Sequence, residues 1–183
     1  MPSYHSKFNQ VECDKICGIP MLQFRKKSSP VLDPKKLSSS PDGSFDIIDE
    51  AIIYFRSNIF FKNFPIEGDS DKLIVYLTVF IQKILEKANI PDMNKAKNIV
   101  KSLVDGCEYV KESQNFFNLL ITDDKNPASY TALKKYLREL RTETVERMVN
   151  ILFDNPETTL DRRFWLALGK KRFLAYEMPC SIK

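Results

Sequence analysis

The 183-residue sequence has few of the residues on which common enzyme sites depend. It contains five Gly, and neither of the glycine-rich phosphate-binding patterns G-x-x-x-x-G-K and G-x-G-x-x-G occurs. Its single His, His5, stands in a tail-like setting, which excludes most metalloenzyme and Ser–His arrangements. The longest apolar run, residues 73–81, is too short for a bilayer crossing of about 20 residues. We therefore expect no enzyme, no bound cofactor and no membrane insertion.

The four Cys do not form a metal-binding pattern. Cys13 and Cys17 could supply two zinc ligands and His5 a third, but Cys107 and Cys180 are isolated, so no second pair completes a site. The first residues include no apolar stretch typical of a secretory signal. We expect ordinary free thiols, no metal and a location in the cytoplasm.

Positive charge gathers at the two ends of the chain. Residues 1–45 carry seven Lys and Arg against four Asp and Glu, and residues 161–183 carry six against two. The intervening residues have a small acidic excess. Basic ends suit an acidic partner surface, and they equally suit solvated, solubilising tails.

The pattern divides the chain into residues 1–43 and residues 44–183. The first segment holds five of the ten Pro and cannot sustain a long helix. We interpret it as an extended N-terminal arm packed on the domain or on a partner. The second segment is expected to form a single helical domain, with its first helix starting near Ser44 or Asp46.

Four further helices are expected from periodicity and capping residues. Residues 70–87 are apolar on all sides over the first turns, which indicates a helix buried all round, with a strand as the competing interpretation. Asp92 caps the next helix, which Gly106 ends. Asn126 and Pro127 open a helix of about 27 residues that reaches residue 154. The last helix covers residues 160–176, capped by Thr158 with Asp161, and it could break at Gly169.

The sequence therefore predicts an all-α fold: a compact helical bundle with one central buried helix surrounded by the others, plus the arm. Charged side chains on the long helix have i, i+4 spacing and are expected on a solvated face. They are Arg138, Glu139, Arg141, Glu143 and Arg147. The adjacent carboxylates at residues 49–50 and 123–124 are not expected to catalyse a reaction, because neighbours on a helix point about 100° apart and the helix dipole accounts for the first pair.

Basic and aromatic residues alternate near the C-terminus. Arg162 and Arg163 precede Phe164 and Trp165, and Lys170, Lys171 and Arg172 precede Phe173. Such a patch can anchor a protein interface or grip nucleic acid, and it can also be the solvated edge of a packed helix.

Several sequence blocks, in order, resemble the 21-kDa subunit (subunit 3) family of the actin-related protein 2/3 complex. They are residues 1–6 (MPSYHS), 16–22 (ICGIPML), 46–52 (DIIDEAI), 60–63 (FFKN), 71–77 (DKLIVYL), 136–138 (YLR), 140–144 (LRTET), 164–165 (FW) and 171–173 (KRF). Residues 89–126 depart from this pattern, because a lysine-rich helical stretch replaces the family's loop rich in proline and glycine. Phe164 stands where the family often has the first of two adjacent Trp.

The resemblance implies an all-α, non-catalytic subunit of the complex that nucleates branched actin filaments, located in the actin cytoskeleton. It implies partners among the actin-related proteins, the other small subunits and the actin filament, and it places the chain between the third actin-related protein and the mother filament. Because actin-type surfaces are acidic, the expected protein contacts are in the arm and the C-terminal patch: Tyr4, His5, Arg162, Arg163, Lys170, Lys171 and Arg172. The alternative is a basic helical module that binds nucleic acid.

Overall fold

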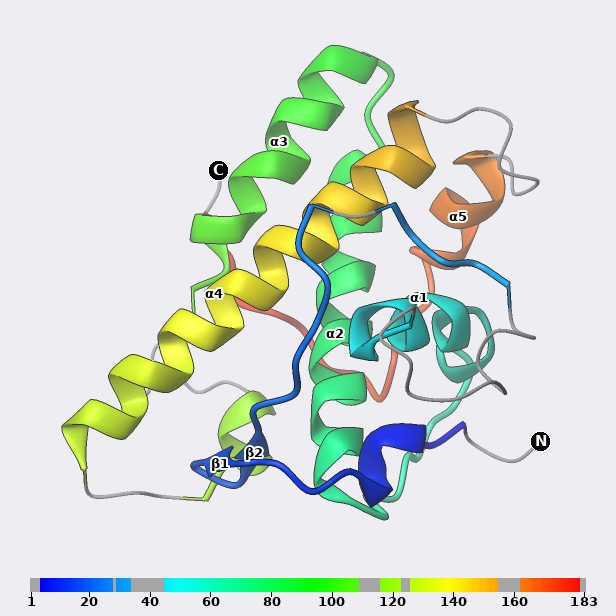
Figure 1. The fold of residues 1–183 in the computed structure, drawn as a ribbon. Helices are drawn as coiled ribbons and strands as arrows, with labels where there is room; N and C mark the ends of the chain where they lie inside the picture. The colour runs from blue at the N-terminus through cyan, green and yellow to red at the C-terminus, as the bar shows by residue number, and fades with distance from the viewer. Residues whose placement is uncertain are drawn as a thin grey trace.

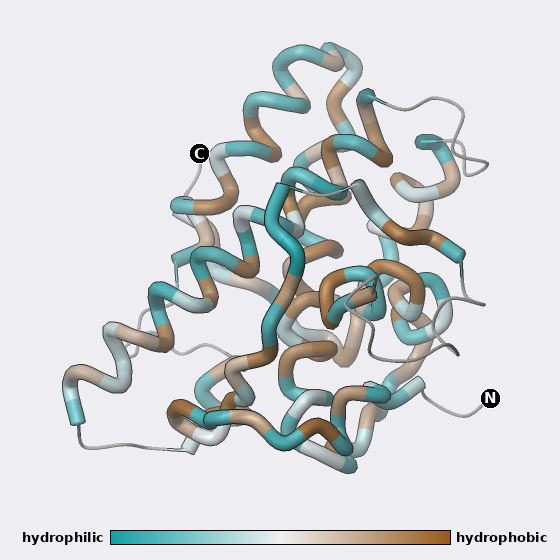
Figure 2. Tube along the Cα trace, viewed as in Figure 1, coloured by the Kyte–Doolittle hydropathy of each residue, from teal (hydrophilic) through white to brown (hydrophobic). Residues whose placement is uncertain are grey.

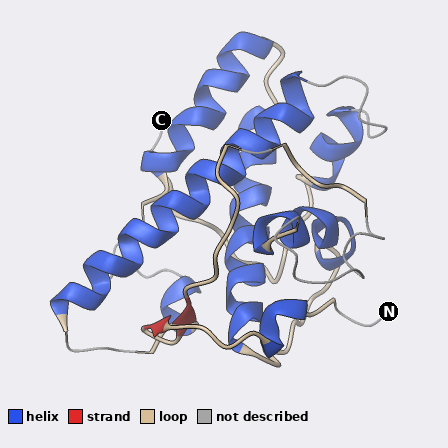
Figure 3. Ribbon diagram, in the orientation of Figure 1, coloured by secondary structure: helices blue, strands red, loops and turns tan. Residues whose placement is uncertain are grey.

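The computed structural model describes residues 4–27, 29–33, 45–108, 116–122, 126–154 and 162–181, and these form mainly helices (Figures 1 and 3). In chain order the elements are η1 (Lys7–Gln10), β1 (Lys15–Ile16), β2 (Ile19–Pro20), α1 (Ile47–Asn58), α2 (Asp69–Ala88), α3 (Met93–Gly106), η3 (Phe116–Leu119), α4 (Pro127–Val149), η4 (Asn150–Asp154) and α5 (Arg162–Leu168). The predicted helical class is right for the greater part of the fold, but the strands β1 and β2 were not predicted.

Helix α2 lies between the other helices. It packs against α1, α3, α4 and α5, and also against β2 and η1 (Figure 1). All residues from Leu73 to Ile81 are buried, which explains why this segment has no polar face. The helix predicted for residues 70–87 is confirmed, and the competing strand is wrong.

Helix α3 is amphipathic, in contrast to α2. Only Ala96, Val100 and Leu103 of α3 are buried, and apolar and polar stretches alternate along its trace in Figure 2. Its buried stripe packs against α4 and α2. The lysine-rich segment that departs from the family pattern thus begins with a surface helix.

Side-chain caps begin the helices where the sequence places Asp or Asn. The Asp46 carboxylate accepts hydrogen bonds from the Ile48 and Asp49 N–H groups and forms a capping box with Asp49. Asp92 caps α3, and Asn126 caps α4 with Pro127 at its first turn. These three caps are confirmed. The alternative start at Ser44 and the predicted cap at Thr158 and Asp161 lie outside the described residues.

The last two helices differ from their predicted lengths. The α-helical part of α4 ends at Val149, and the chain continues to Asp154 as the π-helical turn η4. Helix α5 ends at Leu168, before residue 176 and at the break indicated by Gly169. An added Cβ on Gly169 would lie 2.5 Å from the Leu85 Cβ of α2, so the backbone of Gly169 must approach α2 closely.

The N-terminal arm makes a two-stranded antiparallel hairpin at the base of α2. Lys15 pairs with Pro20 and Ile16 with Ile19. The two turn residues, Cys17 and Gly18, have φ values of 51° and 73°. Strands of two residues are too short to show an alternating pattern, so the turn at Gly18 was the only local signal.

Beyond the hairpin the arm runs across α4. The Tyr136 hydroxyl donates a hydrogen bond to the Leu22 carbonyl at 3.0 Å, and Lys26 pairs with Glu139 at 2.8 Å. Among the described residues, no helix combines the length and apolar character needed to span a membrane.

Candidate protein-interaction surfaces

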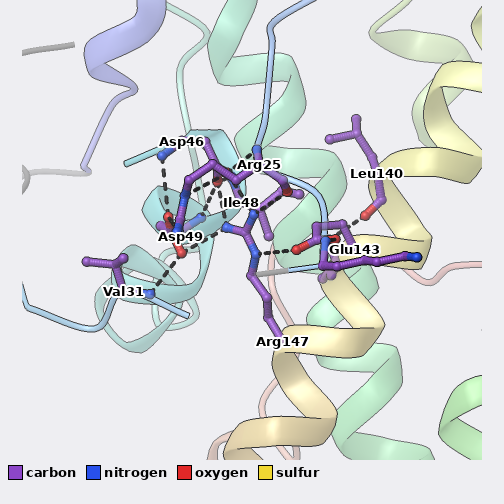
Figure 4. Close-up of polar contacts among 10 residues, drawn as sticks. Arg25, Val31, Asp46, Ile48, Asp49, Leu140, Glu143 and Arg147 are labelled. Atoms are coloured by element: carbon purple, nitrogen blue, oxygen red, sulfur yellow. Dashed lines mark hydrogen bonds and ion pairs between the residues drawn. The ribbon is translucent and has the colours of Figure 1, made fainter. Parts of the chain in front are cut away.

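A buried arginine on α4 joins the N-terminal arm to α1 (Figure 4). The two terminal nitrogens of Arg147 each bond one oxygen of Asp46 at 2.7 Å, and Nη1 also lies 2.8 Å from Asp49. Its Nε bonds Glu143 at 3.0 Å, and Nη2 donates to the Arg25 carbonyl of the arm at 2.8 Å. The Arg25 guanidinium in turn pairs with Asp49. Five charged side chains from three segments are thus held in one network.

Burial and ion pairing act in opposite directions on the pKa values of the charged groups in this network. Burial alone would raise the pKa of Asp46, but the hydrogen bonds and charge of Arg147 hold that pKa below its usual value. Burial, followed by the neighbouring charge of Asp46, raises the pKa of Asp49. Burial opposes the charge on Arg147, yet its bonds to Asp46 raise its pKa. The cluster therefore depends on Arg147 as the counter-charge of the buried carboxylates.

A second buried cluster holds the start of the arm. On α1, Glu50 accepts hydrogen bonds from the Ser6 hydroxyl at 2.6 Å and from the Lys7 N–H at 2.9 Å. On α2, Asp71 accepts from the Ser6 N–H at 2.7 Å and from the Asn9 amide at 3.0 Å. Glu50 and Asp71 are fully buried. The two carboxylates thus serve as acceptors for backbone and side-chain donors of the arm.

The two predicted contact residues in the arm differ in exposure. Tyr4 exchanges two hydrogen bonds with the Asn58 side chain through its backbone and leaves 45% of its surface exposed. His5 Nδ1 lies 2.8 Å from Asp71, and its Nε2 lies 3.3 Å from Glu67. The tail-like setting expected for His5 is wrong, because its ring is packed between α2 and the preceding loop.

The predicted basic residues of α5 also differ from one another. Arg162 donates to the Ala88 carbonyl at 2.7 Å, and its guanidinium lies 5.4 Å from the centre of the Phe153 ring. It is half-buried and fastens α5 to the end of α2. Arg163 is exposed.

The remaining basic residues lie together beyond α5 and form what we call the basic patch: Lys170, Lys171 and Arg172. All three are exposed and line a groove of about 310 Å³ beside the C-terminal half of α2. Arg172 pairs with exposed Glu177 at 2.8 Å. The Phe173 N–H bonds the Gln82 side chain at 3.0 Å, which fixes the backbone under the patch.

The predicted solvated face of α4 needs correction. Arg141, Glu143 and Arg147 are 1%, 4% and 0% exposed, whereas Arg138 is exposed. Arg141 bonds the Tyr76 hydroxyl at 2.9 Å and the Val104 carbonyl at 2.8 Å. The arm covers one side of this helix and α3 the other. Charged side chains whose spacing had suggested a solvated face are therefore buried. In the sequence, the apolar positions of this helix shift after Leu140 to Val145, Met148 and Val149, and this shift was the signal for the change.

All four Cys are free thiols, and burial raises the pKa of the Cys107 thiol. Within the described ranges, no group of three or more His, Cys, Asp or Glu side chains is placed to hold a metal ion.

Comparison with known proteins assigns this mainly helical protein, with its packed arm and exposed basic patch, to a family. Residues 1–178 match the family model described as ARP2/3 complex ARPC3 (21 kDa) subunit. The chain is 30% identical to Actin-related protein 2/3 complex subunit 3 of Entamoeba histolytica, over 94% of this chain and 89% of the relative. Identity to the Arabidopsis thaliana protein of the same name is 31%, covering 93% and 96%, and to the Schizosaccharomyces pombe protein 30%, covering 95% and 98%.

The chain therefore belongs to the family of the 21-kDa subunit of the actin-related protein 2/3 complex. The resemblance found in the separate sequence blocks is confirmed over nearly the whole chain. Since this is a family of non-catalytic structural subunits, the expectation that the chain is not an enzyme is confirmed as well.

Proposed function

We propose that the chain is a structural subunit of an actin-related protein 2/3 complex that supports actin nucleation and branched filament formation. In this proposal it bridges the third actin-related protein to the other subunits and to the mother filament, within the cytoplasmic actin cytoskeleton. Family membership supports the assignment to the complex. The bundle around α2 and the arm packed on it supply a rigid body that can transmit force between two neighbours.

The observation that carries the proposed contact is the basic patch. Lys170 and Lys171 have no carboxylate partner among the described residues, whereas Lys26 and Lys97 are paired with Glu139 and Asp154. The chain folds back on α2 through Phe173, which is fully buried, and so presents the patch on a fixed backbone. A fixed patch of exposed cations favours an acidic protein surface such as that of an actin-type subunit.

The other predicted contact residues have different weights in this proposal. Tyr4 and Arg163 are exposed. His5 and Arg162 already bond groups inside the chain, so we propose that they act by holding Tyr4 and α5 in place. Residues 1–43 act as the arm in this proposal, and residues 44–183 as the domain that carries it.

Co-expression with the other subunits from the same organism tests the proposal. The variant reverses the patch (Lys170→Glu, Lys171→Glu, Arg172→Glu), and the control reverses three exposed lysines elsewhere (Lys95→Glu, Lys101→Glu, Lys135→Glu). The two variants have the same net charge. We expect the wild-type chain to purify with the actin-related subunits, the patch variant to show weaker incorporation or branching, and the control to behave as wild type.

Two outcomes would contradict the proposal. If the wild-type chain does not purify with the actin-related subunits, the assignment to the complex fails. Equal branching by the patch variant and the wild type would remove the patch from the mechanism. Binding of labelled RNA at low salt, lost in the patch variant alone, would support the nucleic-acid alternative instead.

A further inference from the structure

A second surface, distinct from the basic patch, is aromatic. Three of the exposed large hydrophobic side chains among the described residues meet at one groove of about 460 Å³: Phe60, Tyr4 and Phe164 are 58%, 45% and 39% exposed. We call it the aromatic groove and define it by Tyr4, Tyr54, Arg56, Phe60, Phe164 and Trp165. Exposed apolar side chains scattered singly are ordinary, but a contiguous set around a hollow marks an interaction site.

The groove has a rigid floor because its walls belong to packed elements. On α1, Ile52 and Phe55 are buried in the core, while Arg56 is exposed, and Phe60 is exposed in the turn that follows the helix. Trp165 is 1% exposed, and its ring lies 6.1 Å from that of Phe55. The Tyr4 ring stacks on Tyr54 at 5.1 Å, so the arm forms one wall. The groove is thus already formed in the isolated chain, which lowers the conformational cost of binding.

The charge of the groove is positive. The exposed guanidinium of Arg56 lies 5.1 Å from the centre of the Phe164 ring. Among the described residues, none that lines the groove is acidic and none is an acidic partner of Arg56. Aromatic side chains beside an arginine are the composition typical of energetically dominant interface positions. A complementary occupant presents apolar side chains next to a carboxylate.

We propose that the aromatic groove is a docking surface for a segment of a neighbouring subunit that places an aliphatic or aromatic side chain against Phe60 and Phe164 and a carboxylate against Arg56. This inference rests on the proposed function, because it takes the neighbour to be a subunit of the same complex. The groove faces out from α1 and the N-terminal half of α5, whereas the basic patch lies beyond the C-terminus of α5 beside α2. The chain thereby has one apolar and one basic contact surface, which is what a bridging subunit requires.

The test uses the chain co-expressed with the other subunits, with two single variants of the groove. Phe60→Asp places a charge on the apolar wall, and Arg56→Glu reverses the charge. Ile66→Asp and Met93→Asp are the controls, since these side chains have comparable exposure, 41% and 43%, outside the groove. Each labelled chain within the purified complex is chased with unlabelled wild-type chain, and its dissociation rate is measured.

We expect Phe60→Asp and Arg56→Glu to dissociate at least tenfold faster than wild type, Arg56→Lys to recover most of the difference, and both controls to match wild type. Thermal melts of the free chains should agree, since the substituted side chains are exposed. Wild-type dissociation rates for both groove variants would overturn the docking surface while the proposed function stood.

Two other outcomes would show that the proposed partner or the proposed function is wrong. If the free wild-type chain forms a dimer by sedimentation and Phe60→Asp abolishes it, the occupant is a second copy and the proposed partner is wrong. If the wild-type chain does not enter the complex at all, the proposed function fails and this inference fails with it.

Discussion

Both ends of the chain carry an excess of positive charge, and the structure treats Arg25 at one end and the lysines of the basic patch at the other in opposite ways. In the N-terminal arm, Arg25 and the backbone donors of Ser6 and Lys7 turn inward to buried carboxylates on α1 and α2. Near the C-terminus, Lys170 and Lys171 stay in solvent. The difference lies in the acidic side chains nearby. Buried Asp and Glu face the arm, whereas among the described residues the acidic side chains beside the basic patch are the exposed Glu177 and Glu86. A local excess of charge in the sequence therefore does not by itself indicate a surface for partners.

Removing Arg147, the counter-charge of the buried carboxylates that hold the arm, should have the largest effect on stability. Arg147→Met leaves Asp46, Asp49 and Glu143 buried without their main partner, and we expect a loss of about 3–5 kcal/mol in the free energy of unfolding. Urea unfolding measures this loss. Arg138→Met on the same helix is the control, since its pair with Asp105 is exposed and should contribute less than about 1 kcal/mol. Equal losses of stability in the two variants would contradict the contrast between the buried charge of Arg147 and the exposed charge of Arg138.

Glu50, which accepts hydrogen bonds from Ser6 and Lys7 of the arm, should make the free energy of unfolding depend on pH. Burial raises the pKa of Glu50 from 4.5 to about 7, against the lowering effect of its bonds from Ser6 and Lys7. Between these two values the folded chain holds a proton that the unfolded chain has released, so this group's contribution to stability is lost as pH rises. Glu50→Gln removes the titration, so its unfolding free energy relative to wild type should rise by on the order of 3 kcal/mol from pH 4.5 to 7.5.

The comparison between Glu50→Gln and wild type isolates Glu50 from the other groups. Asp46 acts in the opposite sense, because its lowered pKa means that its stabilisation is lost as pH falls, but this effect is common to both proteins. Urea unfolding at several pH values gives the difference. A difference that stays constant over the whole range would show that Glu50 titrates alike in the folded and unfolded chains.

Adding a methyl group at Gly169, next to the basic patch, should have an intermediate effect on stability. A methyl group on Gly169 would lie 2.5 Å from the Leu85 Cβ and 3.3 Å from the Leu85 carbonyl carbon, so α2 or the turn must move. We expect Gly169→Ala to cost about 1–3 kcal/mol and to displace the basic patch. Thermal unfolding measures the cost, with Ala167→Ser at an exposed position of α5 as the control. A gain in stability would show that the turn tolerates a side chain.

The smallest effect is expected at the exposed pair of the basic patch. Arg172 and Glu177 are 68% and 62% exposed, so a double-mutant cycle with Arg172→Ala and Glu177→Ala should give a coupling energy of less than about 1 kcal/mol. The same cycle with Arg25→Ala and Asp49→Ala should give a larger value, because Asp49 is fully buried. Equal coupling energies would mean that burial does not make the Arg25–Asp49 pair stronger than the exposed Arg172–Glu177 pair.

Local signals in the sequence predicted the helices well where they were strong. The capping residues Asp46, Asp92 and Asn126 and the apolar run that forms α2 each point to one structure through short-range chemistry. Gly169 likewise indicated the break after Leu168. The hairpin turn, in contrast, is held by a hydrogen bond from the Thr122 N–H to the Cys17 carbonyl, and Thr122 is distant in the chain.

The candidate surfaces were only partly predictable for the same reason. Lys170, Lys171 and Arg172 are exposed beside buried Trp165 and Phe173, but they lie beyond α5 and not on the helix predicted for residues 160–176. Burial of Arg147 did not follow from helical spacing, because its partners Asp46 and Arg25 come from other segments. Likewise, no local pattern brings Tyr4 to Phe60 and Phe164 at one groove. Charge and aromatic content identify candidates, and the tertiary fold decides which of them face outward.

The separation between Asp46 and Arg147 also has a consequence for how the chain is made. The bonded groups are 101 residues apart, and a ribosome adding about 5–20 residues per second needs roughly 5–20 s to cover that distance. Over this interval the arm and α1 have emerged, but the guanidinium that neutralises their carboxylates has not yet been synthesised. The stretch around Arg25 and Asp46 therefore waits for Arg147, whereas the start of the arm has its own carboxylate partners, Glu50 and Asp71, before α4 is made.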